Sequence, residues 1–235
     1  MSNESIIIEK RLQNLNLDRF EFAAQSVRQL KRALPSRMIC DVGAGDERLR
    51  FPIEAEGMEW RGFDLAPMNA RIVRWDLDEE SPVAAKGAGM VLLLEVIEHL
   101  RNPGVALRHL AEILPVGGRL LITTPNPRWS RSRLHALRTG FLACFTQRDL
   151  DLNAHVFPVW PHVLVQLLRE SGFTVDSYVT LDGATVWPGR PLTLRYPLRF
   201  IHAVLNKWIE RRDLSACGMS YGMIARRNSG SSARC

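Results

Sequence analysis

Three acidic residues in this chain lie at or near the ends of short apolar segments, where β-strands would finish. Asp41 precedes the turn Gly43-Ala44-Gly45, and Asp64 and Asp76 follow along the chain. A Gly-x-Gly turn between a strand and a helix is typical of loops that hold a nucleotide. The dinucleotide-binding form would need a third glycine at position 48, where this chain has Arg48. Because Asp41 would repel a pyrophosphate, the loop favours a ligand that carries an ammonium group.

The two later aspartates suit the rest of such a ligand. Asp64 lies nineteen residues after Gly45 and can accept hydrogen bonds from both hydroxyls of a ribose. Asp76, which precedes Leu77, can accept one from an adenine amino group. Taken singly, each acid would be an ordinary turn residue at a strand end. Their occurrence at three successive strand ends favours one nucleoside-containing ligand.

Alternating strand-like and helix-like segments must position these residues. Such alternation predicts an α/β fold with a mostly parallel sheet and helices on both faces. The predicted strands cover seven segments: 37–42, 60–64, 71–75, 89–94, 119–123, 173–180 and 220–225. The predicted helices cover 18–33, 46–55, 103–114, 161–171 and 197–212. We interpret residues 1–235 as a single domain.

Composition excludes several other classes of protein. The chain is 46% hydrophobic and 24% charged, which is ordinary for a folded domain. No apolar run approaches the ~20 residues that span a bilayer, and the N-terminus lacks the longer apolar core of a signal peptide. The four cysteines have no CxxC spacing, so neither a disulfide framework nor a zinc knuckle is indicated. These features lead us to expect a cytoplasmic protein.

The net charge of +6 is concentrated in two stretches, 127–160 and 181–219, which carry +3 each. Both are too long for ordinary connections in α/β folds, which run about 2–6 residues, so we interpret them as basic insertions. The first leaves the carboxyl end of a strand, where open α/β sheets bind ligands, and is therefore placed to cap a site. Four of the six tryptophans also lie here, at positions 129, 160, 187 and 208.

The chain resembles the class I S-adenosylmethionine-dependent methyltransferases over roughly residues 35–180, with a matching final strand at 220–227. The resemblance rests on five motifs: Asp41-Val42-Gly43-Ala44-Gly45, Asp64, Asp76-Leu77, Glu95-Val96-Ile97-Glu98-His99-Leu100, and Gly117-Gly118 with the strand leading to Pro125-Asn126. It implies a Rossmann-like fold and S-adenosylmethionine as the cofactor. The implied cofactor-binding residues are Asp41, Gly43, Gly45, Asp64, Asp76, Leu77 and Glu95. Glu47 departs from the family pattern, which commonly has glycine or a small residue there, and we expect its side chain to crowd the cofactor's carboxylate.

Within this superfamily, the Glu95–His99 motif looks like the branch of ubiquinone-biosynthesis O-methyltransferases and small-RNA 3′-end 2′-O-methyltransferases. In some of those enzymes the matching residues bind a divalent metal, and His155 lies where the RNA branch has another ligand. The resemblance thus implies Mg²⁺ or Zn²⁺ held by Glu95, Glu98, His99 and His155. The first three would share one face if the turn is helical. Alternatively, these residues only line the cofactor pocket and cap the next helix. The first insertion is also similar to stretches in methyltransferases of bacterial surface-glycan pathways.

The predicted reaction is methyl transfer to a hydroxyl of a small molecule, a glycan or a lipid-linked acceptor. Positioning supplies most of the catalysis, because the sulfonium loses its charge as the methyl group leaves. A weakly acidic hydroxyl also needs a base or a metal, for which His99, His155 and Glu95 are the candidates. The alternative is an RNA 2′-O-methyltransferase or an inactive basic RNA-binding relative. Nucleic acid is the less favoured partner, because the insertions lack a recognised RNA-binding motif.

Residues 197–212 form a predicted amphipathic helix within the second insertion. Such helices usually pack their apolar side on a core. The flanking arginines also allow peripheral contact with a membrane, which would place the protein at the inner face of that membrane. The apolar side holds Leu198, Ile201, Leu205, Trp208 and Ile209, and the flanks hold Arg195, Arg199, Arg211 and Arg212.

Overall fold

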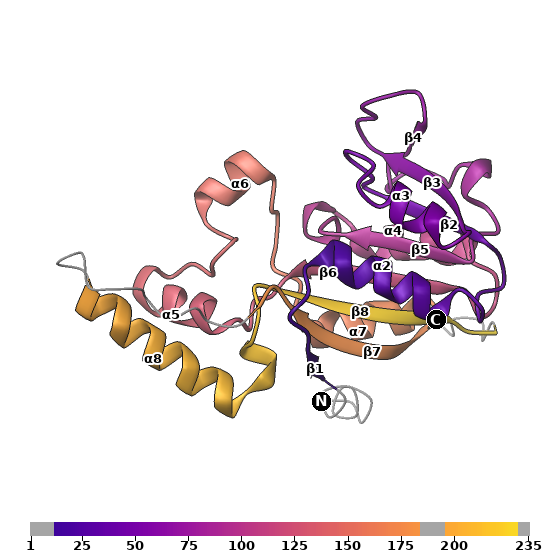
Figure 1. Ribbon diagram of the computed structural model, residues 1–235. Helices are drawn as coiled ribbons and strands as arrows, with labels where there is room; N and C mark the ends of the chain where they lie inside the picture. Colours follow the sequence, from indigo (N-terminus) through magenta and orange to yellow (C-terminus); the bar gives the residue numbers. More distant parts are fainter. Residues whose placement is uncertain (1–11, 184–195, 230–235) are drawn as a thin grey trace.

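An eight-stranded sheet forms the centre of the computed structural model, which describes residues 12–183 and 196–229 (Figure 1). The strand order is β1-β7-β8-β6-β5-β2-β3-β4, and β8 alone runs antiparallel to its neighbours. The strands are β1 (Gln13–Asn14), β2 (Met38–Val42), β3 (Glu59–Asp64), β4 (Ile72–Arg74), β5 (Met90–Leu94), β6 (Arg119–Pro125), β7 (Phe173–Leu181) and β8 (Ser220–Arg227). The predicted α/β fold with a mostly parallel sheet is confirmed. The predicted number of seven strands is wrong by one, because the two-residue β1 joins the edge of the sheet beside β7.

Helices cover both faces of the sheet and enclose two apolar cores. On one face lie α2 (Arg19–Leu30) and α3 (Arg50–Ala55), which bury Phe22, Val27 and Ile53. On the other lie α4 (Pro103–Ile113) and α7 (Pro161–Glu170), which bury residues such as Leu110 and Leu168. The predicted helices at 18–33, 103–114 and 161–171 are therefore present with slightly shorter bounds.

The helix predicted at 46–55 begins four residues late, at Arg50. Between β2 and α3 the backbone of Gly45 and Glu47 is left-handed, with φ of 49° and 59°, so this stretch is a loop. A left-handed residue cannot continue a right-handed helix. Pro52 then falls in the first turn of α3, where its missing N–H leaves no hydrogen bond unmade. The glycine turn therefore extends further along the chain than its two glycines suggest.

The strand order places a ligand site between β2 and β5. From β2 the chain proceeds outward through β3 and β4, then returns to the other side of β2 and continues through β5 and β6. Such a reversal leaves a crevice beyond the carboxyl ends of the two central strands, where open α/β sheets bind ligands. Asp41 pairs with Leu92 across β2 and β5, so the loops after both strands leave from the same edge.

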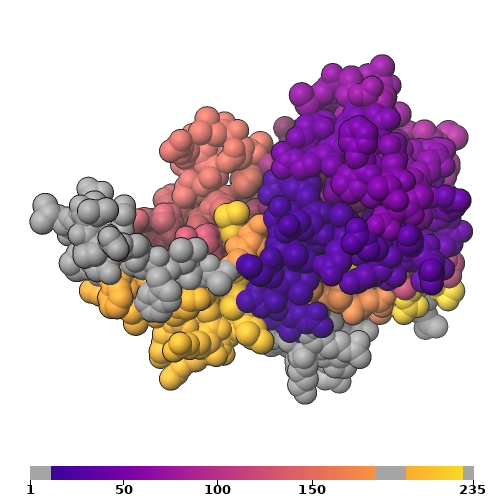
Figure 2. All heavy atoms as spheres, in the orientation of Figure 1, coloured from indigo at the N-terminus to yellow at the C-terminus, as the bar shows by residue number. Residues whose placement is uncertain are grey.

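The two insertions form a lobe at one side of the sheet, which projects from the body in Figures 1 and 2. The first contributes α5 (Ser130–Thr139) and α6 (Gln147–Asn153), and the second contributes α8 (Tyr196–Arg212), which contacts α5. Trp187 and Arg195 lie outside the described residues. Short 3-10 helices occur at η1 (Val83–Ala85), η2 (Ile97–His99) and η3 (Leu214–Ala216). Among the helices described, none combines the length and the apolar character that crossing a bilayer requires.

Candidate functional site

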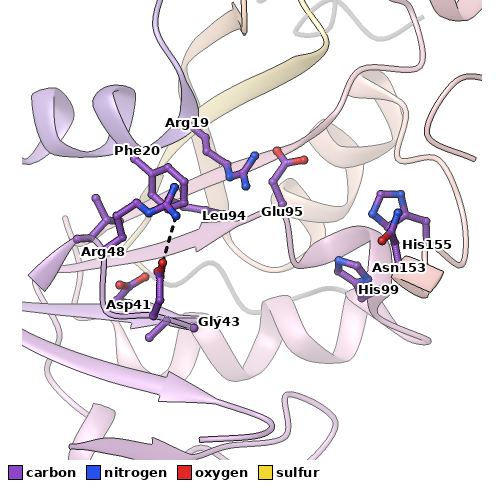
Figure 3. Close-up of a pocket in the computed structure, with 14 residues that line it drawn as sticks. Arg19, Phe20, Asp41, Gly43, Arg48, Leu94, Glu95, His99, Asn153 and His155 are labelled. Carbon is purple, nitrogen blue, oxygen red and sulfur yellow. Dashed lines mark hydrogen bonds and ion pairs between the residues drawn. The ribbon is translucent and has the colours of Figure 1, made fainter. Parts of the chain in front are cut away.

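A cavity of about 500 Å³ opens where the loops after β2 and β5 separate (Figure 3). This volume lies within the range of ~300–1,000 Å³ that is usual for small-molecule sites. The start of α2 and the end of the first insertion complete its wall. The lining comprises Arg19, Phe20, Asp41, Gly43, Ala44, Gly45, Asp46, Arg48, Leu49, Leu94, Glu95, His99, Asn153 and His155. Of the residues that the sequence predicts for cofactor or catalysis, six line this cavity: Asp41, Gly43, Gly45, Glu95, His99 and His155.

The glycine loop after β2 is held against β3 and leaves no room for a side chain at its first glycine. The amides of Gly43 and Ala44 both donate to the carbonyl of Phe63, at 2.8 and 3.0 Å. Gly43 has φ of 81°, and a Cβ added there would lie 2.5 Å from Cγ2 of Val96, which follows β5. Only glycine adopts this backbone readily without steric cost. Gly43 therefore lets the two loops that form the cavity approach each other.

Asp41 is a buried carboxylate at the base of this loop. Its Oδ2 accepts a hydrogen bond of 3.0 Å from Nε1 of Trp60. Burial raises the pKa of Asp41 to about 6, although the Trp60 hydrogen bond opposes this shift. A bound cation would favour the charged form, because an opposite charge at short range stabilises a carboxylate. The position therefore suits the ammonium group expected from the sequence.

This pKa predicts a pH dependence of cofactor binding. Protonation of Asp41 as the pH falls through about 6 removes the charge that attracts an ammonium group, so affinity for S-adenosylhomocysteine should decline below that pH, approaching about tenfold per unit. Titration calorimetry from about pH 8 to about pH 5 measures this decline. Asp41→Asn keeps an acceptor for Trp60 but no titrating charge, so its affinity should be weaker and nearly independent of pH. A wild-type affinity that stays constant across this range would refute the role of Asp41.

Asp64 and Asp76 are not among the residues that line the cavity, although Asp64 contacts the lining residue Gly45. Asp64 accepts hydrogen bonds of 3.0 Å from the amides of Gly45 and Ala66, one on each carboxylate oxygen. Asp76 accepts one of 3.0 Å from the amide of Asp78, and Leu77 is buried in the core. Each carboxylate oxygen keeps a second lone pair, so neither acid is saturated by these bonds. Their roles toward a ribose and an adenine stay predictions.

Glu95, which is half-buried, and Glu98, which is fully buried, are two carboxylates in the stretch that follows β5. Burial raises the pKa of both, and the charge of Glu98 raises that of Glu95 further, while the Arg19 guanidinium opposes these shifts. Oε2 of Glu98 accepts a hydrogen bond of 2.8 Å from Thr124, and its Oε1 is buried without a hydrogen-bond partner among the described residues. Glu95 has φ of 54°, a backbone conformation that is costly for a residue other than glycine. Such strain is concentrated at functional sites in folded proteins.

His99 and His155 come from different parts of the chain and meet in the wall of the cavity, with ring centroids 4.9 Å apart. Nδ1 of His99 lies 3.2 Å from the carbonyl oxygen of Ala154, and Nδ1 of His155 lies 2.6 Å from that of Cys144. A carbonyl partner assigns the proton to Nδ1 and leaves Nε2 with a free lone pair in the neutral ring. Each histidine can therefore accept a proton or bind a metal through Nε2.

Three of the four predicted metal ligands come together. Glu98, His99 and His155 each offer one ligand atom, and these atoms lie within 4.8 Å of one another. The expected shared face of Glu95, Glu98 and His99 does not form, because only Ile97–His99 is helical and the left-handed Glu95 precedes it. Glu95 is not part of this group of three.

The sequence did not assign several of the lining residues to the site, among them Arg19, Phe20, Arg48 and Asn153. Cζ of Arg19 and of Arg48 lie 4.9 and 4.4 Å from the centroid of the Phe20 ring, so both cations stack on one aromatic side chain. A capping box at Asp18 and Glu21 starts α2 at this edge of the sheet, and this motif was the available clue. The capping box predicts where α2 begins but not that the start of this helix packs beside the cavity.

Glu47 does not crowd the cavity as the sequence led us to expect. Its carboxylate accepts hydrogen bonds from Asn69 and Arg71, at 2.5 and 3.1 Å, and from Arg50 at 3.4 Å. Desolvation acts to raise the pKa of Glu47, but these hydrogen bonds outweigh it and lower the pKa. The side chain is thus held away from the lining residues. Its φ of 59° explains why glycine suits this position.

A family model described as a methyltransferase domain matches residues 15–178. Curated relatives include two ubiquinone biosynthesis O-methyltransferases. The one from Azorhizobium caulinodans is 30% identical over 120 residues, which cover 46% of this chain and 46% of that protein. The one from Xanthomonas campestris pv. campestris is 30% identical over 132 residues, covering 50% and 53%. The chain thus spans about half the length of these relatives.

Solved structures share the fold at low sequence identity. An S-adenosylmethionine-dependent methyltransferase from Archaeoglobus fulgidus superposes with a TM-score of 0.57 at 18% identity, covering 88% of this chain and 94% of that one. A putative methyltransferase from Bacillus halodurans gives 0.53 at 13% identity, covering 88% and 100%. At such identities the likeness establishes the architecture and leaves the acceptor open.

Proposed function

The chain belongs to the class I S-adenosylmethionine-dependent methyltransferases, and we propose that it transfers a methyl group to a hydroxyl oxygen of its acceptor. The observation that carries this proposal is the pair His99 and His155, which line the same cavity as the glycine loop. A hydroxyl must lose its proton when its oxygen is methylated, and an imidazole near neutrality is suited to accept that proton. The names of the relatives, ubiquinone biosynthesis O-methyltransferases, agree with an oxygen acceptor.

The residues of the cavity fit S-adenosylmethionine. When bound, this cofactor supplies a methyl group on a positively charged sulfur. Asp41 offers a buried carboxylate to the ammonium group, and Gly43 lets the loop that carries it pack against Val96 of the facing loop. Asp64 and Asp76 would bind the ribose and the adenine through their remaining lone pairs. Leu77 would contact the adenine.

Catalysis then depends mainly on alignment. Little charge stabilisation is required, because the reaction neutralises the sulfonium, so holding the acceptor in line with the methyl group provides most of the acceleration. In the transfer, the hydroxyl oxygen would donate an electron pair to the methyl carbon, the electrons of the carbon–sulfur bond would remain on sulfur, and the hydroxyl proton would go to Nε2 of a histidine. The tautomer set by the Ala154 and Cys144 carbonyls leaves this nitrogen unprotonated. Glu95, raised in pKa by burial, is the third candidate for contact with the acceptor.

A divalent metal is the second candidate for activating the hydroxyl. Two histidines with one glutamate form a donor set found at catalytic zinc sites. Glu98, His99 and His155 would hold the ion, and the buried Oε1 of Glu98, which has no hydrogen-bond partner, fits a ligand role. A bound metal would acidify the hydroxyl and orient it. The same nitrogens cannot serve as base and as ligand at once, so the two roles are distinguishable.

The test is transfer of a labelled methyl group to a panel of phenols, glycans, lipid-linked saccharides and RNA, with products identified by mass spectrometry. We expect label on oxygen of a non-nucleic-acid acceptor. Arg128 and Arg133 of the first insertion pair with Asp213 at 3.6 and 2.5 Å, so part of the basic charge that would serve RNA is neutralised within the lobe. Label on nitrogen or carbon would contradict the proposal, and label on RNA would favour the 2′-O-methyltransferase alternative.

A further inference from the structure

Helix α8 turns its apolar side outward, opposite to the arrangement expected for a helix that packs on a core. Its described buried residues are Ala203, Asn206 and Glu210, which follow one another at helical spacing. Two of these three are polar. Packing of the apolar side on a core, one of the two alternatives for this helix, is therefore wrong for Ile201, Leu205 and Trp208, which are exposed, while Ile209 is half-buried.

Polar contacts fix this orientation. Oγ of Ser130, at the start of α5, donates a hydrogen bond of 2.9 Å to Oε1 of Glu210, and both residues are buried. Nζ of Lys207 lies 3.5 Å from the other oxygen of Glu210. Rotating α8 to bury its apolar side would expose the side chain of Glu210 and break its buried hydrogen bond with Ser130. Removing one partner of a buried hydrogen-bonded charge is costly, so the polar side stays against α5.

The outward side of α8 is apolar, and its C-terminal end is basic. We define the α8 face as five exposed apolar residues and two exposed arginines, which lie within an arc of about 140° at 3.6 residues per turn. Trp208 is 53% exposed and Ile201 is 52% exposed, which is high for apolar side chains of this size. Cζ of Arg212 lies 4.2 Å from the centroid of the Trp208 ring. The α8 face comprises Phe200, Ile201, Val204, Leu205, Trp208, Arg211 and Arg212.

The α8 face carries no negative charge. The acid of α8 within residues 200–212 is Glu210, which is buried, and Asp213 just beyond the helix pairs with Arg133 of α5. Apart from Arg211 and Arg212, His202 is the exposed titratable residue within 200–212 of the helix. A surface that is apolar and cationic without acids is complementary to one that is anionic and has an apolar layer beneath.

We propose that the α8 face docks on an anionic membrane surface. An amphipathic helix with tryptophan on its apolar side and arginines beside it lies in the interface plane, with its apolar residues among the acyl chains. Anionic headgroups attract arginines held near the surface. The indole of Trp208 favours this depth, since its ring is amphipathic. Docking depends on α8 alone and holds whatever acceptor the enzyme methylates.

The experiment is co-sedimentation of the full chain with vesicles of phosphatidylglycerol and phosphatidylcholine, and with vesicles of phosphatidylcholine alone. We expect binding to the anionic vesicles that weakens with salt, and little binding to the neutral ones. Ile201→Ser/Trp208→Ser should reduce the partition coefficient at least about 30-fold, because two large apolar side chains no longer insert. Arg211→Gln/Arg212→Gln should reduce the salt dependence.

Two matched controls separate the α8 face from exposed residues elsewhere. Phe51 of α3 is 74% exposed and also has an arginine over its ring, at 5.6 Å, so it resembles Trp208 but lies outside the α8 face. Phe51→Ser should therefore bind vesicles as the wild type does. Arg32→Gln/Lys86→Gln removes the same charge from exposed positions outside the lobe. Far-ultraviolet circular dichroism verifies that each variant is folded.

Three results would overturn the proposal. The first is absence of binding to anionic vesicles. The second is binding that Ile201→Ser/Trp208→Ser and Phe51→Ser alter equally, which would place the contact elsewhere. The third is a wild-type protein that does not bind vesicles but sediments as a dimer, with Ile201→Ser/Trp208→Ser sedimenting as a monomer. This result would make the α8 face an interface between two copies of the chain.

Discussion

His155→Ala should lower the rate of methyl transfer by about 10²–10⁴, the contribution typical of a positioned acid or base, and leave S-adenosylhomocysteine affinity unchanged. His155 comes from the first insertion, on the opposite wall of the cavity from the glycine loop that would hold the cofactor. Removing the imidazole should therefore slow proton transfer from the acceptor and leave cofactor binding unchanged. The measurement compares single-turnover methyl transfer with calorimetric binding in the same preparation.

Two further substitutions separate chemistry from structure. His155→Asn can keep a donor for the Cys144 carbonyl but removes the lone pair of Nε2, so it should be as inactive as His155→Ala. His135→Ala is the matched control, because Nδ1 of His135 also faces a backbone carbonyl, that of Phe141 at 2.8 Å, in the same insertion but outside the cavity lining. Normal turnover in His155→Ala, or rescue by His155→Asn, would reduce this residue to a structural role.

A chelator distinguishes the two roles that remain. If Glu98, His99 and His155 hold a metal, wild-type activity should fall with chelator and return with added Mg²⁺ or Zn²⁺. Full activity in chelator, with His155→Ala inactive, would identify a general base.

The centre of the sheet was predictable because β5 is a continuous apolar run that is buried on both faces. This run is Met90–Leu94, and every predicted strand appears within a few residues of its expected bounds. Strand β1 is missed because its two residues, Gln13 and Asn14, are polar and exposed, and it joins β7 through backbone pairing and one hydrogen bond of 3.1 Å from Oγ1 of Thr180 to Oδ1 of Asn14. No periodicity marks a strand of this kind.

The part of the site that follows the sheet was also predictable. Parallel strands end at one edge, so Asp41 and Glu95 had to lie near each other, together with the loops that follow them. The contribution of α2 to the site was not predictable from the sequence. Arg19 and Phe20 reach the cavity only because α2 packs against this edge of the sheet. His155 was found by resemblance, since more than fifty residues separate it from His99.

Helix α8 shows the limit of periodicity more clearly. The spacing of Ile201, Leu205 and Trp208 predicts an apolar side but not its direction. What decides the direction is a buried hydrogen bond between Glu210 and Ser130, eighty residues apart in the chain. Such a contact between two insertions has no local signature.

The central claim, that the cavity between β2 and β5 binds S-adenosylmethionine, is tested by calorimetry with S-adenosylhomocysteine on three proteins. The wild type should show one site. Gly43→Ala should weaken binding about 100-fold, because its Cβ would meet Val96 and wedge apart the two loops that form the cavity, a distortion of about 2–3 kcal/mol.

Gly117→Ala is the matched control. Gly117 has φ of 85°, close to the 81° of Gly43, but a Cβ there meets nothing within 4 Å. Both substitutions therefore carry the same backbone strain and should lower the melting temperature, Gly43→Ala by more because its Cβ also meets Val96, while only Gly43→Ala should lose affinity. No heat of binding from folded wild-type protein at high ligand concentration, or equal affinity in the two variants, would contradict the assignment of this cavity as the cofactor site.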